Sequence, residues 1–538
     1  MTSIDRWWLR EVGYEVYIRS FGDSDGDGVG DLQGVIDHLD DLAWLGVGVV
    51  WLTPCTKSPM RDHGYDVSDF RSVAEEFGDD ETYRRLCREA ARRGMRILTD
   101  LVPNHTSSEH PWFLDARSSR DSERRGDYLW ADPGPDGGPP NNWVSHFGGP
   151  AWTLDEATGQ YWCHLFLPEQ PDLNWRSERV RQEFDGILRH WIGEGSSGFR
   201  LDVAHALTKH PDFPDLPPAP EDADRFMGRE FENLEHRYDL DQPDNTRVHR
   251  RWRQVADPLG ALLLGEIYVL EPDRLRRYLD PDDGLHLGFW FPPLHIEWTP
   301  ATVRAVVADA VSLPPNKLAW ITGTHDRPRA ASRYGGGEEG RRRALTMQLL
   351  QWGLPGMPWL YQGEELGLDN ATLALEEMHD PFALRNPEKA FMSRDLARTP
   401  MPWAPGEGMG FTDGGTPWLP FGGRGPEETW AVQREDEGSW LHTWRRLIAA
   451  WRGLPELPDD VDLAGAGAVV DYRRGALRVV AKPGCGGGVG HRRRPVDRGV
   501  PPRPRRGRPA RRGGGAGRAG RRRRRLAAEG LTLSLIHI

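Results

Sequence analysis

Short apolar runs recur along the first 361 residues, and segments with helical periodicity separate several of them. Each run is short enough to be one buried strand. Strands that alternate with helices form a parallel sheet, and eight such strands close a (β/α)8 TIM barrel. The predicted strands are residues 14–21, 47–52, 96–101, 198–202, 262–266, 286–291, 318–322 and 357–361. The helices predicted between them are residues 33–45, 80–94 and 178–193.

One long interval interrupts this alternation after the third predicted strand. Residues 104–175 are rich in Gly, Pro, Asn and Trp and show no helical period. A connection of this length is too long for a loop inside a compact domain. We therefore predict that residues 104–175 are an inserted domain B. The catalytic barrel would then comprise residues 1–103 and 176–437.

The C-terminal part of the chain changes character twice. A predicted helix at 438–452 is followed by the alternating segments 468–474 and 476–481, which predict strands of a small β-domain over 438–484. From residue 485 onward Arg, Gly and Pro dominate, as in GC-rich DNA translated in the wrong frame, and the final LSLIHI matches translated sequencing-adapter DNA. We interpret 485–538 as a disordered frameshift and adapter artefact that truncates the β-domain.

Composition argues against several classes of partner. Residues 482–538 contain 17 of the 69 basic residues and two of the 81 acidic residues, so the remainder is acidic and disfavours nucleic acid and anionic membranes. No run of about 20 apolar residues predicts a membrane span, and the N-terminal segment lacks the apolar core of a signal peptide. The four widely spaced cysteines indicate free thiols in a cytoplasmic protein. The oligomeric state stays open between monomer and dimer.

Three acidic residues, Asp202, Glu266 and Asp326, lie at or just after the ends of three different predicted strands. The C-terminal ends of parallel barrel strands meet at one face, where catalytic groups collect. A carboxylate at a strand end can also cap the following helix. Three together favour glycoside chemistry, which needs a nucleophile, a proton donor and control of their charges.

Six short motifs accompany these acids in a fixed order: DLVPNH (100–105), QPDLN (170–174), GFRLD (198–202), GE (265–266), HD (325–326) and GMPWLYQGEE (356–365). Their order and spacing resemble glycoside hydrolase family 13, the α-amylase family, and within it the oligo-1,6-glucosidase and α-glucosidase group. The resemblance implies an exo-acting retaining α-glucosidase for terminal α-1,4 and/or α-1,6 bonds of short malto- or isomalto-oligosaccharides and disaccharides. It implies no cofactor for the chemistry.

The resemblance assigns roles to the acids. Asp202 matches the nucleophile that forms a covalent glucosyl-enzyme, and Glu266 matches the acid/base. Asp326 matches the third acid, which binds sugar hydroxyls and helps to keep Glu266 protonated by like-charge repulsion. Arg200 precedes the nucleophile by two residues on the same strand face, so we expect it to pair with Asp202 and keep that carboxylate ionised.

The resemblance also implies a substrate-binding set around the acids. Two histidines hydrogen-bond the sugar beside the scissile bond, and an acid and a tyrosine close the pocket behind the non-reducing end. Two aromatic residues and a glutamine line the pocket and its approach, and an arginine gates it or contacts the sugar. In that order, these residues are His105, His325, Asp62, Tyr65, Phe147, Phe166, Gln170 and Arg398.

A second acidic motif is DSDGDGVGD at residues 23–31. Acids that alternate with small residues let a loop wrap oxygen atoms around a hard cation. The motif is no EF-hand, because it lacks the Glu at position 12. It resembles the family's metal loop after the first strand, which implies a structural Ca²⁺ or Mg²⁺ ion away from the three acids. The implied ligands are Asp23, Asp25, Asp27, Asp31 and the carbonyl of Val29.

Two alternatives to hydrolysis stay open. One is a sugar isomerase or transglycosylase of the same fold, of the trehalose synthase or sucrose isomerase type. The other is a non-catalytic amylase-like binding module, which would require loss of the acids and a membrane anchor, neither of which the sequence has. Val203, directly after the nucleophile, leans toward α-1,6 preference in the resembled group. Thr324 and Arg327 depart from the family pattern and leave the fine specificity open.

Overall fold

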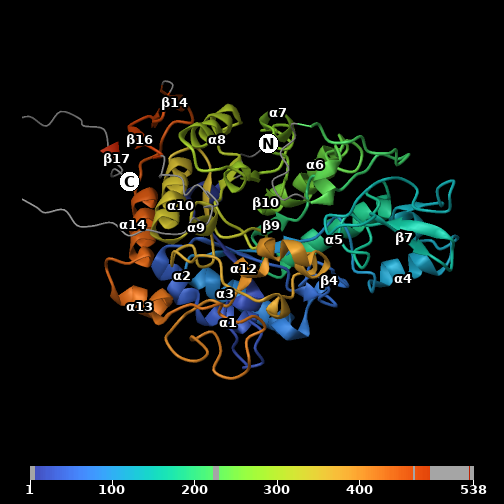
Figure 1. Ribbon diagram of the computed structural model, residues 1–538, viewed down its shortest axis with the longest axis horizontal. Coiled ribbons are helices and arrows are strands. Elements are labelled where there is room, and N and C mark those ends of the chain that lie inside the picture. Colours follow the sequence, from blue (N-terminus) through green and yellow to red (C-terminus); the bar gives the residue numbers. More distant parts are fainter. Residues whose placement is uncertain (1–5, 222–228, 465–466, 485–531, 534–538) are drawn as a thin grey trace, which may run out of the picture.

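The structure is a computed structural model that describes residues 6–221, 229–464, 467–484 and 532–533 (Figure 1). Eight parallel strands close into a barrel in the order β1-β13-β12-β11-β10-β9-β5-β2, which confirms the predicted TIM barrel. The barrel strands are β1 (Gly13–Val16), β2 (Val49–Leu52), β5 (Arg96–Leu101), β9 (Gly198–Leu201), β10 (Leu262–Gly265), β11 (Leu287–Trp290), β12 (Leu318–Trp320) and β13 (Met357–Tyr361).

The first strand is shorter than predicted. The run 14–21 was expected to be one strand, but β1 ends at Val16 and a 3-10 turn over Ile18–Ser20 follows. After Val16, side chains from other segments accept hydrogen bonds from the backbone N–H groups. Tyr17 N donates to Gln362 Oε1 at 2.7 Å, and Ile18 N donates to Thr53 Oγ1 at 3.1 Å. The chain therefore leaves the strand ladder and turns at the mouth of the barrel.

Alternate residues of each strand point to opposite faces, as strand geometry requires. In β2, Val49 and Trp51 face the barrel interior, whereas Val50 and Leu52 belong to the layer between strands and helices. Large indole rings fill the interior. Gly13 permits this packing, because a Cβ atom at that position would lie 2.2 Å from the ring of Trp359. Tryptophan thus serves mainly as core filling in this chain.

Helices surround the barrel, and side-chain caps begin several of them. Asp79 accepts from Thr82 N at 2.7 Å at the start of α3, and Ser177 caps α5. The helix predicted at 33–45 is two helices, because His38 between them is not helical and stacks on Trp403. The helices outside the insertion are α1 (Leu32–Asp37), α2 (Leu39–Leu45), α3 (Asp80–Arg92), α5 (Glu178–Gly193), α6 (Asn245–Ala256), α7 (Pro272–Leu275), α8 (Pro300–Ser312), α9 (Ala330–Arg333), α10 (Gly337–Trp352), α11 (Pro381–Arg385), α12 (Asp395–Arg398), α13 (Trp430–Glu435) and α14 (Trp440–Arg452).

The insertion between β5 and β9 contains a three-stranded antiparallel sheet in the order β6-β8-β7. Its strands are β6 (Trp130–Ala131), β7 (Trp152–Asp155) and β8 (Gln160–Cys163). The segment shows no helical period in its sequence, but it does contain one helix. A helix, α4 (Pro111–Ser118), forms because Pro111 stands at its first position and the His110 ring accepts from Trp112 N. A small hairpin, β3 (Thr56–Lys57) with β4 (Asp69–Val73), follows β2.

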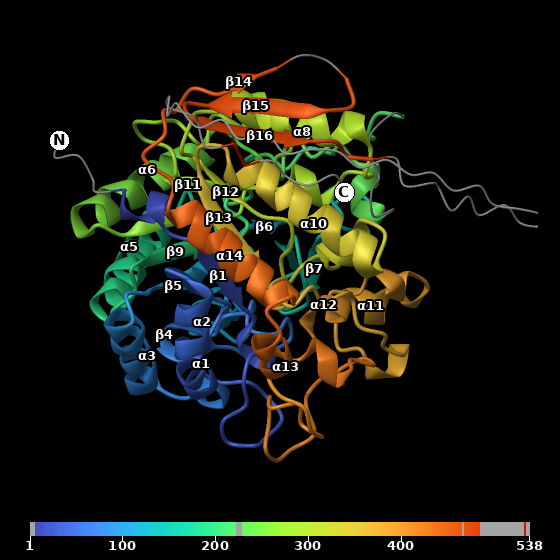
Figure 2. The same cartoon turned by 90° about the vertical axis from the view of Figure 1, so that its left-hand side faces the viewer.

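The C-terminal sheet lies against α8 and α10 (Figure 2) and, in Figure 1, at the end of the molecule opposite β7. Tyr472 anchors it by donating to Leu350 O at 2.7 Å. Its strands are β14 (Asp462–Leu463), β15 (Val470–Arg474), β16 (Leu477–Ala481) and β17 (Thr532–Leu533), the last parallel to β16. The predicted artefact tail otherwise lies outside the described residues and stays a prediction, as do the domain boundaries. Within the described part of the chain, no helix has the length and apolarity to cross a membrane.

Candidate active site

The strand ladder of the barrel fixes the backbone of two of the three predicted acids. Asp202 N donates to Leu101 O at 2.8 Å, and Glu266 N donates to Leu201 O at 2.9 Å. Asp326 lies in the loop after β12. All three are thus carried by C-terminal strand ends at one face of the barrel.

Arg200 brings the acids together. Its guanidinium is buried, with Nη1 at 2.5 Å from Asp202 Oδ1 and 3.1 Å from Asp100 Oδ1. Its Nη2 lies 2.8 Å from Glu266 Oε2. The ring of Trp51 covers the guanidinium at 4.8 Å. One cation therefore contacts two of the three predicted catalytic carboxylates and also Asp100, which sequence reasoning did not select.

The predicted pairing of Arg200 with Asp202 is present, but it does not by itself keep Asp202 ionised. Burial raises the pKa of Asp202 well above its ordinary value, Arg200 opposes this rise, and Glu266 and Asp100 add to it. Burial likewise raises the pKa of Asp100 to about 7 against the opposing effect of Arg200. The physical reason is that one guanidinium is shared among three carboxylates in a buried pocket.

Asp326 has the opposite electrostatic environment. Burial raises its pKa, but His325, Arg398 and Arg394 together lower it below its ordinary value. Arg398 Nη2 lies 2.8 Å from Asp326 Oδ1, and its Nε donates to His325 O at 2.8 Å. The side chain of Arg398 is fully buried, so it is part of the pocket and no surface ion pair. The third acid is therefore held as a carboxylate.

Five of the predicted substrate-binding residues form one hydrogen-bond network. Gln170 Nε2 lies 3.3 Å from Asp62 Oδ2 and 3.1 Å from His105 Nε2, and His105 Nε2 lies 3.0 Å from Tyr65 O. Tyr65 OH in turn lies 2.8 Å from His325 Nε2. The structure thus connects the predicted pocket wall to both predicted sugar-binding histidines.

The two predicted aromatic residues lie beside this network. Phe147 packs with Phe166, Leu167 and Phe382. The ring centroids of Phe166 and His105 are 5.3 Å apart. Both aromatic residues therefore adjoin the pocket, and Phe147 also contributes to a small apolar cluster.

Arg394 is the main residue that sequence reasoning missed. It lies just before α12, and its Nη2 is 2.8 Å from both Asp62 Oδ1 and Asp380 Oδ1, whereas its Nη1 is 3.5 Å from Asp326 Oδ1. It also covers the ring of Phe147 at 5.2 Å. No motif in residues 380–398 signals this role. Asp100, by contrast, ends a predicted strand within DLVPNH, the signal that selected Asp202.

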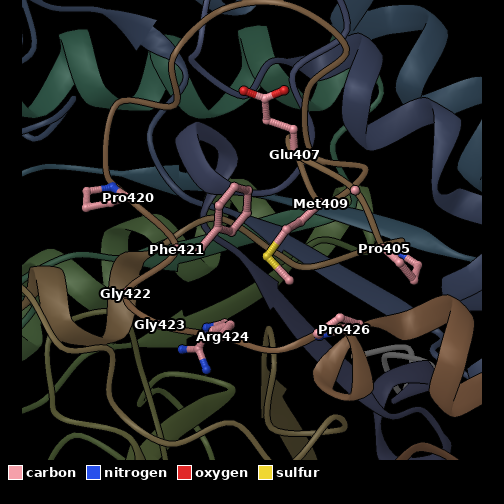
Figure 3. Close-up of a pocket in the computed structure, with 10 residues that line it drawn as sticks. Pro405, Glu407, Met409, Pro420, Phe421, Gly422, Gly423, Arg424 and Pro426 are labelled. Atoms are coloured by element: carbon pink, nitrogen blue, oxygen red, sulfur yellow. The ribbon is translucent and has the colours of Figure 1, made fainter.

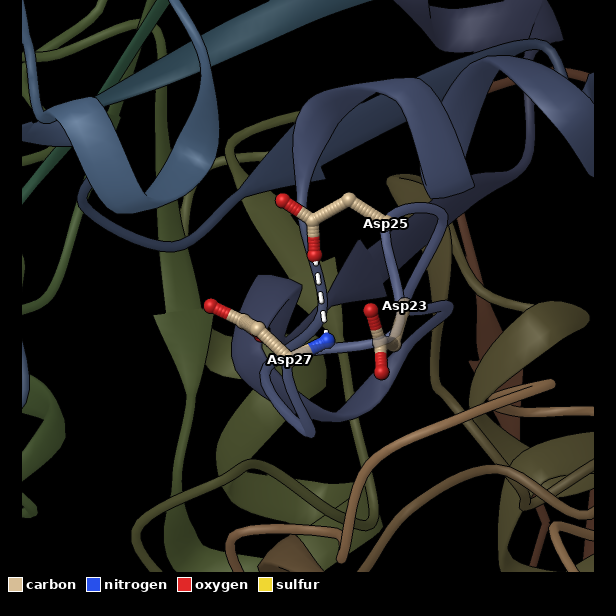
Figure 4. A group of neighbouring side chains, drawn as sticks. All are labelled: Asp23, Asp25 and Asp27. Atoms are coloured by element: carbon tan, nitrogen blue, oxygen red, sulfur yellow. Dashed lines mark hydrogen bonds between the residues drawn. The ribbon is translucent and has the colours of Figure 1, made fainter.

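The acidic loop gathers three of its predicted ligands. Asp23, Asp25 and Asp27 each offer a carboxylate oxygen, and these oxygens lie within 4.8 Å of one another (Figure 4). Backbone N–H groups hold the carboxylates in place, including Gly28 N to Asp23 Oδ2 at 2.8 Å and Val29 N to Asp27 Oδ1 at 2.7 Å. Burial and the neighbouring acids raise the pKa of Asp27. This concentration of negative oxygen atoms fits a hard cation.

Asp31, the fourth acid of the predicted ligand set, also has a structural role. It is the N-cap of α1, where Oδ1 accepts from Gly34 N at 2.7 Å, and Ser24 N donates to Oδ2 at 2.9 Å. The group of three acids does not include it. The helix N-terminus engages this carboxylate because the backbone N–H groups there lack helical partners. Val29 contributes its N–H group to Asp27, as described above.

A separate cavity of about 420 Å³ lies between the loops 405–409 and 420–426 (Figure 3). Phe421, Met409 and several prolines line it, and Glu407 is its only acidic residue. None of the three predicted catalytic acids lines it. We therefore place the candidate site at the Arg200 cluster and not in this cavity.

The chain is similar to known proteins over most of its length. The family model described as "Alpha amylase, catalytic domain" matches residues 15–454. An oligo-1,6-glucosidase from Heyndrickxia coagulans is 38% identical over 478 residues, covering 82% of this chain and 84% of that protein.

Solved structures resemble the chain over a similar extent. The crystal structure of an alpha-glucosyl transfer enzyme has a TM-score of 0.83 and 36% identity, covering 87% of this chain and 89% of the other. A trehalulose synthase from Pseudomonas mesoacidophila has a TM-score of 0.78 and 32% identity, covering 87% and 88% of the two chains.

Proposed function

The chain belongs to the α-amylase family of glycoside hydrolases, and we propose that it is an exo-acting retaining α-glucosidase. Its substrates would be short malto- or isomalto-oligosaccharides and disaccharides, cleaved at terminal α-1,4 and/or α-1,6 bonds. The observation that carries this proposal is the cluster in which Arg200 contacts Asp202, Glu266 and Asp100 at once.

In this proposal the reaction is a double displacement. Asp202 attacks the anomeric carbon, and the bond from that carbon to the leaving oxygen breaks as Glu266 protonates the oxygen. Glu266 then removes a proton from water, which attacks the glucosyl ester and releases glucose and the Asp202 carboxylate. Retaining enzymes need two closely spaced carboxyl groups. Contact of both with neighbouring nitrogens of one guanidinium supports that spacing.

The exo action is supported by the contacts behind the acids. Asp62 bonds Gln170 and Arg394, and Arg394 also bonds Asp380, so charged side chains are tied together across the predicted blind end. A chain that ran through this end would break these buried ion pairs at a cost of several kcal/mol. We therefore assign Asp62, Tyr65, His105, Phe147, Phe166, Gln170, His325 and Arg398 to the binding of one terminal glucose and its approach.

The acidic loop belongs to the same proposal. We assign Asp23, Asp25 and Asp27 to a structural Ca²⁺ or Mg²⁺ ion, which would stabilise the loop and take no part in the chemistry.

Among the described residues, Cys55, Cys87 and Cys163 are buried free thiols. These thiols support the proposed cytoplasmic location.

Glucosyl transfer or isomerisation is the second candidate function. The resemblance to a trehalulose synthase and to an alpha-glucosyl transfer enzyme favours it. Both functions would share the covalent intermediate, and they differ in whether water or a sugar hydroxyl accepts the glucosyl group. Hydrolysis is favoured by the similarity to oligo-1,6-glucosidase.

A side-by-side assay of maltose, isomaltose, sucrose and trehalose separates these functions. Hydrolysis predicts free glucose, which proton NMR should detect first as the α-anomer. Conversion of sucrose to an isomer without free glucose would establish the alternative. Initial β-glucose would rule out double displacement, and release of maltotriose from starch would rule out exo action.

A further inference from the structure

Glu15 is the one charged residue of β1, and its carboxyl group lies inside the mouth of the barrel, 3% exposed. Its backbone carbonyl continues the strand ladder by accepting from Gln362 N at 3.1 Å. Its side-chain Oε1 accepts from His325 N at 3.2 Å and also contacts Nδ1 of the same histidine. A buried acid thus contacts the back of the imidazole ring that the proposed function assigns to sugar binding.

The other ring nitrogen of His325 faces the pocket. Nε2 lies 2.8 Å from Tyr65 OH and 3.3 Å from Asp326 Oδ2. The rings of Tyr17 and Tyr65 stack with the imidazole, with centroid distances of 5.6 Å and 5.5 Å. Arg398 holds the histidine backbone through His325 O. The ring is therefore held with Nδ1 toward Glu15 and Nε2 toward the third acid.

These contacts determine which of the two ring nitrogens of His325 carries a hydrogen. A carboxylate such as Asp326 can only accept, so Nε2 is attracted to it only if Nε2 carries a hydrogen. A neutral imidazole carries one hydrogen, so Nδ1 then needs a proton from its other neighbour to complete the short contact with Oε1. Burial raises the pKa of Glu15 well above its ordinary value, which keeps a proton available at this carboxyl group.

We propose that Glu15 is a positioning residue that shares a proton with His325 Nδ1 and thereby keeps Nε2 as an N–H donor toward Asp326 and a sugar hydroxyl. The proton can sit on Oε1 or on Nδ1, and in both cases Nε2 retains its hydrogen. No proton is consumed, because the shared proton stays between the two atoms through the cycle. The sugar contact in this inference rests on the proposed glycosidase function.

The substitution Glu15→Gln separates proton sharing from simple space filling. The amide has the shape of the carboxyl group, and His325 N–H requires its oxygen, not its NH2 group, at the place of Oε1. That oxygen can only accept, so Nδ1 must carry the single hydrogen of the neutral ring. Nε2 then loses its hydrogen and presents a lone pair to Asp326.

Nitrogen-15 NMR of histidine-labelled protein reads this state directly, with His325→Asn identifying the signal. The parent should show a protonated Nε2 at neutral pH, and Glu15→Gln should show an unprotonated Nε2. We expect Glu15→Gln to lower kcat/KM for 4-nitrophenyl α-glucoside about 10- to 100-fold, the range of a lost charge-assisted hydrogen bond. Glu365→Gln is the matched control, because Glu365 is a buried carboxyl group that accepts from Tyr14 OH at 2.9 Å, and it should leave kcat/KM unchanged.

Three results would overturn the inference. The first is an unprotonated Nε2 of His325 in the parent protein, and this measurement does not depend on whether any variant folds. The other two are an unchanged nitrogen signal in Glu15→Gln and full activity of that variant. Failure of the parent to cleave any α-glucoside would instead refute the proposed function and would leave the NMR test of the shared proton standing.

Discussion

Two groups of carboxylates in this molecule differ in which groups offset the repulsion between their negative charges. In the active-site pocket, buried acids alternate in space with Arg200, Arg394 and Arg398. In the loop 23–31, the three clustered acids are held by backbone N–H groups, and within the described residues no arginine or lysine forms an ion pair with them. The pocket therefore contains its own cations, whereas the cation proposed for the loop would come from solution.

This difference has a physical consequence. Arginine stays charged at every accessible pH, and its planar guanidinium contacts several carboxylates in fixed directions. The pocket charges are thus permanent and oriented, which suits groups that must meet a substrate. The proposed ion at the loop would be exchangeable, so we expect the loop charges to affect stability and not chemistry. The predictions below test this contrast, from the largest expected effect to the smallest.

Asp202→Asn should lower kcat about 10⁴-fold or more, because the amide cannot act as the nucleophile of a covalent mechanism. The measurement is steady-state hydrolysis of 4-nitrophenyl α-glucoside, with the thermal midpoint as a check on folding. Asp212→Asn, at an exposed position, should change neither value. Activity of Asp202→Asn within tenfold of the parent would exclude Asp202 as the nucleophile.

Arg200→Met should destabilise the protein by about 3–5 kcal/mol, because it leaves two buried carboxylates and the partly buried Glu266 without their shared cation. The thermal midpoint should fall by about 3–5 °C. Differential scanning calorimetry would measure the change. Arg250→Met removes an exposed pair with Asp283 and should have a much smaller effect. Equal shifts in the two variants would show that the pocket cations are dispensable for stability.

Removal of divalent cations with EDTA should lower the thermal midpoint by about 3–4 °C, because an ion that binds only the folded state stabilises it by mass action. Added Ca²⁺ should restore the midpoint. Asp27→Ala should show the lower midpoint in both conditions, whereas Asp212→Ala should respond to EDTA as the parent does. Insensitivity of the parent to EDTA would mean that backbone N–H groups alone suffice for the loop.

Asp31→Ala should lower the thermal midpoint by about 1 °C, since loss of an N-cap costs about 1 kcal/mol. The shift should be the same with and without EDTA, because the structure uses Asp31 to cap α1. Asp31→Asn, which retains a capping oxygen, should keep most of the stability. A shift seen only in the presence of Ca²⁺ would return Asp31 to the ligand set.

Local patterns in the sequence predicted most of the barrel. Residues 96–101 and 357–361 were predicted strands with the bounds of β5 and β13, because each contains a short apolar run, and these runs are buried in the structure. The end of β1 was not predictable in this way. The side chains of Gln362 and Thr53 accept hydrogen bonds from the backbone N–H groups just after β1, and both residues are distant in sequence.

The candidate site also contains residues that local sequence predicts and residues that only the fold brings together. Asp202 and Glu266 could be predicted because strand ends carry them to one face. Arg394 could not, because it reaches Asp62 and Asp326 from a segment without strand or helical period, and only the folded chain brings these residues together. Glu15 left a weak signal, a single acid in an otherwise apolar strand, whose meaning depends on the distant His325.

The sharing of Arg200 also bears on the timing of the proposed reaction. When Asp202 becomes an ester, it loses its negative charge, so its attraction to Arg200 Nη1 weakens. The guanidinium then interacts mainly with Asp100 and Glu266. It therefore stabilises the ionised form of Glu266 at the step in which that residue must take a proton from water. Release of glucose restores the Asp202 charge and draws the guanidinium back. Each turnover would thus move one unit of negative charge from Asp202 to Glu266 within the pocket and return it, while Arg200 stays in contact with both positions.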